Sequence, residues 1–148
     1  MDKNLYLISL SEGPGTSFGD TAFGEQSLPQ QIFSCVWELE SQVNMSGFRS
    51  FFESAEPDLI GATCGALVTI GASNCAQIVR AAQNVVCPGP LPETQEAMEE
   101  MIGSLTEDQE ATLNELDTAF YGYPDDLTQL LYAFVEKHPE HFGETPEL

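Results

Sequence analysis

The chain has 148 residues, with 24 acidic and four basic side chains and a formal net charge of −20. Nine Phe and an apolar content of 42% argue against disorder, and the length fits one domain with a sizeable core. Because four cations cannot neutralise a run of phosphates, we expect no direct binding to nucleic acid or to an anionic membrane surface.

The first 54 residues contain a loop and then a helical segment. Within residues 1–27, the first ten have no clean period, which predicts a short strand or a first helical turn, and the remainder is a Gly-rich surface loop. A helical domain is predicted over residues 28–138. It opens at Ser27, which forms a capping-box spacing with Gln30, and its first helix runs to about Val43.

Residues 44–54 form a junction that concentrates aromatic side chains. Phe48, Phe51 and Phe52 stand at i, i+3 and i+4, so they share one face of a short helix and are interpreted as core. Gly47 allows the backbone to turn tightly before them. The structural junction therefore comprises Asn44, Gly47, Phe48, Phe51 and Phe52.

The remaining elements are also helices. One begins near Pro57 and closes at Gly71, and the next is capped by Asn74 and ends before Pro88. An acidic piece follows and ends near Gly103.

A capping box at Thr106 starts another helix, whose period places Leu113 and Phe120 inward and Asp117 outward. The last helix begins at Leu127, and residues 139–148 are expected to be a frayed acidic tail. Short turns between the helices predict an all-α, single-domain, multi-helix bundle of antiparallel helix pairs.

The reactive residue types predict no enzyme, cofactor or metal site. The cysteines lie at apolar helical positions without Cys-x-x-Cys spacing and are interpreted as reduced core thiols. His138 and His141 lie near the chain end with no fixed ligands or nucleophile beside them. No signal peptide and no membrane span is apparent, so a cytoplasmic protein is expected.

The negative charge is concentrated after residue 92. Residues 93–147 hold fifteen acids and one base, whereas residues 1–92 hold nine acids and three bases. Carboxylates one helical turn apart lie about 5–6 Å from each other, a spacing of the same order as that of DNA phosphates. The predicted partner-binding acidic face comprises Glu93, Glu96, Glu99, Glu100, Glu107, Asp108, Glu110, Asp125 and Asp126. The alternative is a surface that serves solubility alone.

Three runs carry a resemblance to a known family: residues 43–52, residues 66–72 and residues 113–121, together with the Leu127 to Phe134 stripe. They resemble a bacterial family of domains of unknown function that includes an acidic DNA-mimic protein, the DNA-mimic-protein-nineteen-like family. The similarity covers about residues 28–138. The family typically has Asn-Asn-Gly-Gly-Phe at the junction, so Met45 and Ser46 depart from its pattern.

The resemblance implies an all-helical domain without known catalysis. Its mimic member is dimeric and occupies the DNA-binding surface of a transcription regulator through carboxylates. We therefore expect an acidic protein-binding module, with a basic transcription regulator or nuclease as partner and a homodimer as one possible assembly. Two alternatives stay open: an immunity-type inhibitor of a basic nuclease toxin, and a small-ligand binder using a pocket around Trp37, Asn44, Ser46 and Arg49.

Overall fold

The computed structural model describes residues 5, 7, 8 and 23–142, and that part of the chain contains helices and no strand. The predicted all-α class is confirmed. None of the described helices combines the length and apolarity needed to cross a bilayer. The elements are η1 (Phe23–Glu25), α2 (Leu28–Ser54), α3 (Pro57–Ile70), α4 (Ser73–Val86), α5 (Gln95–Gly103), α6 (Glu107–Tyr121), α7 (Leu127–Glu136) and α8 (Pro139–Phe142).

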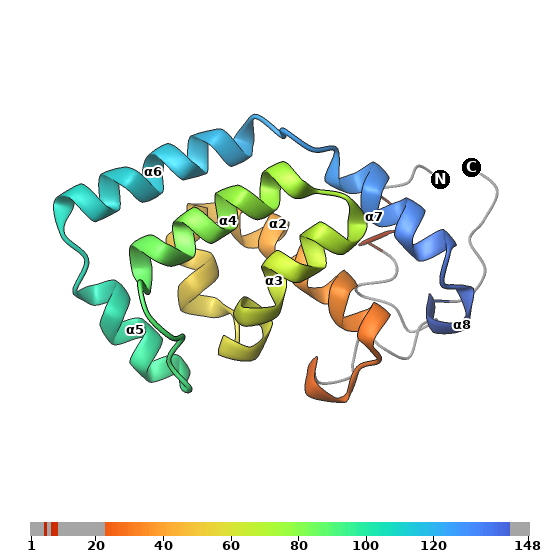
Figure 1. Cartoon of the computed structure of the whole chain (residues 1–148), viewed down its shortest axis with the longest axis horizontal. Coiled ribbons are helices and arrows are strands. Elements are labelled where there is room, and N and C mark those ends of the chain that lie inside the picture. The colour runs from red at the N-terminus through yellow and green to blue at the C-terminus, as the bar shows by residue number, and fades with distance from the viewer. Residues whose placement is uncertain (1–4, 6, 9–22, 143–148) are drawn as a thin grey trace.

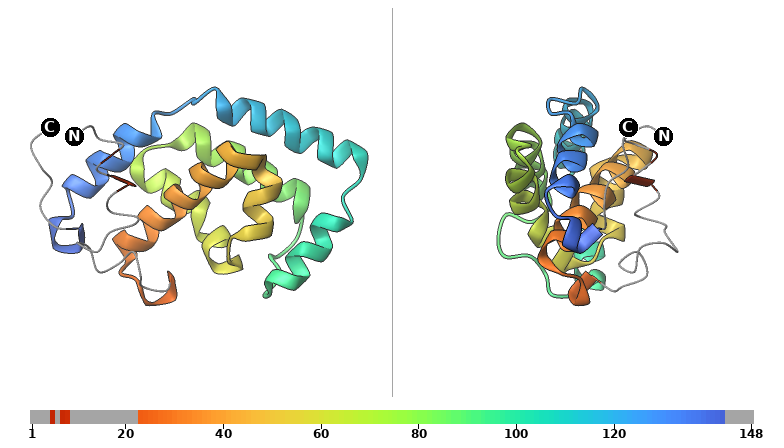
Figure 2. Two further views of the ribbon diagram at one scale, coloured as in Figure 1. Left: turned by 180° about the vertical axis from the view of Figure 1, so that it is seen from behind. Right: turned by 90° about the vertical axis from the view of Figure 1, so that its right-hand side faces the viewer.

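Helix α2 is the centre of the bundle, and it contacts η1, α3, α5, α6, α7 and α8. Helices α3 and α4 run in opposite directions and pack on each other, and α6 packs along α4 and α2 (Figure 1). Seen from behind, α5 lies near the end of the molecule opposite α7 and α8 (Figure 2). The acid-rich helix α6 thus runs along one edge of the bundle, and α5 lies at the end where α6 begins (Figure 1).

Most helix ends follow the local signals in the sequence. Ser27 and Gln30 form the predicted capping box of α2, and Thr106 and Gln109 form that of α6. Gly71 closes α3 in the left-handed conformation, with φ of 92°.

A kink at Gly47 divides α2 into two segments. Gly47 has φ of 87°, a region that favours glycine. The break removes i−4 partners from the first amides of the second segment, and the Phe48 N–H donates instead to Asp117 Oδ1 on α6 at 2.8 Å. A Cβ added at Gly47 would lie 2.5 Å from Asp117 Oδ2. The prediction that Asp117 faces solvent is therefore wrong, because its carboxylate caps the second segment.

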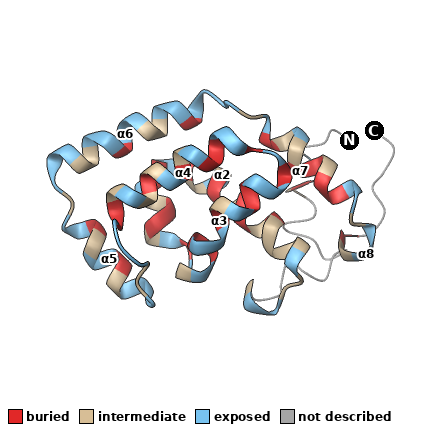
Figure 3. Ribbon diagram, in the orientation of Figure 1, coloured by how far each residue is buried: buried red, intermediate tan, exposed pale blue. Residues whose placement is uncertain are grey.

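The kink turns the junction aromatics into the core as predicted. Phe48, Phe51 and Phe52 are fully buried (Figure 3 shows the buried residues in red). The Phe48 ring meets Phe120 of α6 edge-on, with ring centroids 5.8 Å apart. Each buried ring stabilises the fold by roughly 1.5–3 kcal/mol, so the junction joins α2 to α6 by packing as well as by the Asp117 hydrogen bond.

A polar network holds the first segment of α2 against the turn between α6 and α7. The Asn44 amide donates to the Tyr123 hydroxyl at 2.7 Å, and that hydroxyl donates to Glu40 Oε1 at 3.0 Å. The Tyr121 hydroxyl donates to the Val43 carbonyl at 2.9 Å. Burial is the main cause that raises the pKa of Glu40.

The C-terminal end of the chain departs from the sequence-based expectation. The tail does not fray from residue 139, because Pro139–Phe142 forms α8 and the buried Phe142 ring packs against Phe33 and Phe134. Residues 143–148 and most of the predicted loop over 1–27 lie outside the described residues. Leu7, which is described, is helical and buried in the core.

We predict that the Asp117 contact holds the kink. Asp117→Ala leaves the Phe48 amide without its acceptor and should lower the free energy of unfolding by about 1–2 kcal/mol. Asp117→Asn keeps an acceptor oxygen and should cost less. Glu115→Ala, at an exposed position on the same helix, is the control and should stay within about 0.5 kcal/mol of the parent. Urea unfolding followed by circular dichroism measures all three, and equal losses for Asp117→Ala and Glu115→Ala would disprove the role.

We also predict that stability rises on mild acidification. Burial raises the pKa of Glu40 and of Asp117, so the folded state binds these protons more tightly than the unfolded state. The free energy of unfolding should therefore increase as the pH falls from about 8 to about 5. The double variant Glu40→Gln, Asp117→Asn should flatten this slope. A control double variant, Glu115→Gln with Glu136→Gln, removes two exposed charges and should keep more of it; equal slopes would refute the assignment.

Candidate functional site

Six of the nine predicted partner-binding acids are exposed and lie close together in sequence: one just before α5, three on α5 and two in the first turn of α6. Within the described part of the chain, the ion pairs involve only Arg49 and His141 among the bases, so no cation pairs with these six carboxylates. We call this set the α5–α6 acidic face: Glu93, Glu96, Glu99, Glu100, Glu107 and Asp108.

Helix ends and core contacts fix the acidic face in place. Thr94 caps α5 by accepting from the Ala97 amide at 3.2 Å, and the capping box at Thr106 starts α6. Met98 and Ile102 on the opposite side of α5 are buried. The carboxylates therefore project from short helices that the core anchors. Acids in the first turns are also favoured by the helix dipole.

Glu110 forms an ion pair within the protein and is therefore kept separate from the acidic face. Its Oε1 pairs with Arg49 Nη1, and Arg49 Nε pairs with Glu53 at 3.0 Å. These groups are about half exposed, so the pairs contribute little stability. They do neutralise part of the Glu110 charge, and the prediction that Glu110 joins the partner-binding set receives no support from its surroundings.

Asp125 has a structural role at the start of α4. Its Oδ2 accepts from the Cys75 amide at 2.8 Å and its Oδ1 accepts from the Asn74 side chain at 3.2 Å. The prediction that Asn74 caps α4 is therefore wrong, because Ala72 occupies the cap position and Asp125, from a distant part of the chain, receives the amide.

Asp126 is the N-cap of α7 and accepts from the Gln129 amide at 3.1 Å. Asp125 and Asp126 also follow the C-terminal end of α6, whereas the acidic face lies on or just before α5 and at the N-terminal end of α6 (Figure 1). The structure thus does not bring these two acids into the acidic face.

The predicted small-ligand pocket is two separate hollows. Trp37 and Asn44 line one of about 210 Å³, together with Glu40. Ser46 and Arg49 line another of about 250 Å³, which also meets Glu110 and Asp117. These two hollows therefore divide the four predicted residues between them.

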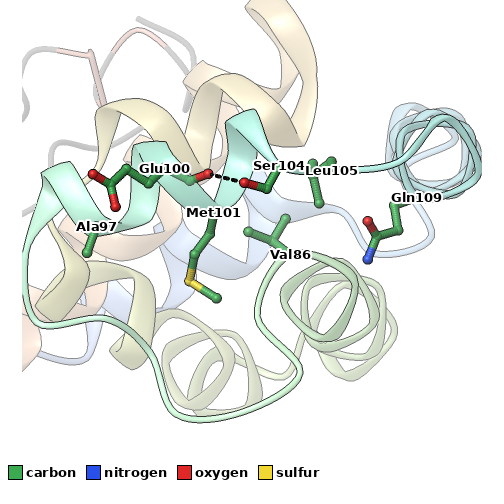
Figure 4. Close-up of a pocket in the computed structure, with 7 residues that line it drawn as sticks. All are labelled: Val86, Ala97, Glu100, Met101, Ser104, Leu105 and Gln109. Atoms are coloured by element: carbon green, nitrogen blue, oxygen red, sulfur yellow. Dashed lines mark hydrogen bonds between the residues drawn. The ribbon is translucent and has the colours of Figure 1, made fainter.

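A larger groove, which sequence reasoning did not predict, lies beside the acidic face. It has a volume of about 490 Å³ and lies between the end of α4, one side of α5 and the start of α6 (Figure 4). Its lining comes from three helices and a loop, so no local spacing marks it. The lining residues are Val86, Ala97, Glu100, Met101, Ser104, Leu105 and Gln109.

The cysteines fit their predicted role as core thiols. All four are free, and Cys35, Cys75 and Cys87 are buried. Burial raises the pKa of the Cys35 and Cys75 thiols to about 12. Because the thiolate is the reactive form, these side chains are poor nucleophiles near neutral pH.

Comparison with known proteins identifies the family. A family model described as DMP19-like protein matches residues 24–138, which include the Gly47 junction and helices α5 and α6. No curated protein and no solved structure gives a significant match. Since the matched segment covers well over half of the sequence, the chain belongs to the family of DMP19-like proteins.

Proposed function

We propose that this chain is a non-enzymatic cytoplasmic protein whose acidic face binds the basic surface of a DNA-binding protein, and that it acts there as a DNA mimic. The observation that carries the proposal is the α5–α6 acidic face, whose six exposed carboxylates pair with no cation of the described residues. Membership of the DMP19-like family supports it.

The charge balance favours a cationic partner. With a formal net charge of −20, the protein repels other anions and attracts basic surfaces at a distance, which accelerates encounter. Carboxylates held on helices keep their spacing on binding, so a partner does not have to order a flexible acidic tail. A surface that only kept the protein soluble would not need this fixed arrangement.

The partner class follows from the same chemistry. A transcription regulator and a nuclease both present a basic groove shaped for phosphates, so either accepts an anionic surface of this kind. Two copies of the chain repel each other through this face, and a homodimer would form through another surface. An immunity-type role is the form the proposal takes if the partner is a nuclease.

A matched pair of charge variants tests the proposal. The first variant changes the five Glu of the acidic face to Gln and Asp108 to Asn. The control neutralises six exposed acids elsewhere: Glu25, Glu56, Asp58, Glu115, Glu136 and Glu140. Both variants carry the same net charge. Each protein is immobilised and exposed to lysate of the source cell at about 50 mM and about 500 mM salt, since screening weakens steered association.

The expected result is a basic DNA-binding protein retained by the parent and the control at low salt, and lost with the face variant. Excess duplex DNA should release it, because mimic and DNA compete for one surface. Retention by the face variant, retention that salt does not weaken, or a bound protein that DNA does not displace would each contradict the proposal.

A further inference from the structure

The groove between α4, α5 and α6 has an apolar floor and lies next to the acidic face. Val86, Met101 and Leu105 form the floor, and their side chains gather between α5 and the start of α6 (Figure 4). The Cys87 thiol contacts Met101, with 3.4 Å between Cys87 Sγ and Met101 Sδ. The groove has a volume of about 490 Å³ and is broadly open to solvent, so it suits a side chain laid along a surface.

The polar side chains of the groove select the charge of an occupant. The Ser104 hydroxyl donates to the Glu100 carbonyl at 2.9 Å. Gln109 uses both ends of its amide, accepting from the Thr106 amide and donating to the Val85 carbonyl. Among the lining side chains, only the Glu100 carboxylate is left without a hydrogen-bond or ion-pair partner within the described residues. A polar occupant that pairs with Glu100 must therefore bring a hydrogen-bond donor, and a cationic donor also neutralises the carboxylate charge.

An occupant that fits both parts of the groove has an apolar stem and a cationic end. Lysine and arginine side chains combine these features and commonly bury their methylene groups while the charge stays near solvent. The acids that flank the lining residues in sequence, Glu96 before Ala97 and Asp108 before Gln109, add to the negative field there.

A second copy of the chain is a poor occupant. It carries the same net charge of −20 and only four basic residues. One of these, Arg49, is already paired with Glu53 and Glu110. Charge complementarity therefore points to a basic partner protein.

We propose that this groove is an anchor site for a long basic side chain of the partner, with its methylene stem on Val86, Met101 and Leu105 and its cation at Glu100. The inference rests on the proposed function and adds a specific pocket to the acidic face. It predicts that affinity depends on the length of the partner's basic side chains as well as on their charge.

Two labelled peptides separate stem length from charge. The first is nona-lysine, and the second is a nonamer of 2,4-diaminobutyric acid, which has the same number of amines on stems two methylenes shorter. Binding is measured by fluorescence anisotropy at about 50 mM salt. The parent protein should bind nona-lysine about fivefold to fifteenfold more tightly, which corresponds to partial or full burial of two methylene groups.

A variant that fills the groove without changing the charge should abolish this preference. Ala97→Phe places a ring in the groove. If circular dichroism shows that this variant is unfolded, Ala97→Leu is used in its place. Leu is a milder change and should reduce the preference for nona-lysine. The control Ala111→Phe makes the same change at an exposed position on α6 that does not line the groove, and it should keep the preference.

The experiment distinguishes failure of the groove proposal from failure of the proposed function. Equal affinities for the two peptides, or a preference that survives Ala97→Phe, would overturn the groove proposal and leave the acidic face intact. Displacement of nona-lysine by an equal concentration of free spermidine, with the same sensitivity to Ala97→Phe, would assign the groove to a polyamine and also overturn it. If neither peptide binds the parent protein, the proposed function fails as well.

Discussion

The hydrogen bond between the Asp117 carboxylate and the Phe48 amide is the contact on which the arrangement depends. It lies where α2 breaks, and the close approach of the carboxylate leaves room only for glycine at position 47. The break turns three phenylalanines into the core and fixes α6 against α2. Because α5 joins α6 through a short loop, the direction in which the acidic face points follows from this contact. Met45 and Ser46, where the chain departs from the family pattern, are exposed and leave this geometry unchanged.

The acids of this protein divide into those that build the fold and those that face solvent. Asp117, Asp125 and Asp126 each accept a backbone amide at the start of a helical segment, where a negative charge opposes the helix dipole favourably. Glu110 shares the Arg49 guanidinium. Of the exposed carboxylates, six lie on α5, just before it or in the first turn of α6, and others lie scattered over the remaining elements. The high negative charge is therefore compatible with a stable fold, because some of the acidic side chains cap helical segments, a role that neutral side chains such as Ser or Thr also fill.

Local patterns predicted the helices well, and contacts between distant residues explain the failures. Capping boxes and apolar periodicity act within one or two turns, so the helix starts at Leu28 and Glu107 could be predicted from sequence. The role of Asp117 could not, since periodicity alone assigns it to the wet side of α6. Asp125 reaches Cys75 across fifty residues, and the groove draws on three helices. Such sites depend on how the helices pack, which no spacing in one segment reveals.

A protein that competes with DNA for a basic surface needs more than charge, and an apolar groove beside the carboxylates would supply it. Binding that rests on charge alone weakens steeply as salt rises, and DNA itself offers a denser line of charge than six carboxylates. A mimic gains an advantage where it adds something DNA phosphates lack, namely apolar surface for the stems of the partner's basic side chains. Burial of those stems is much less sensitive to salt than the attraction between charges. The combination would let a small protein hold a DNA-binding surface at the ionic strength of the cell.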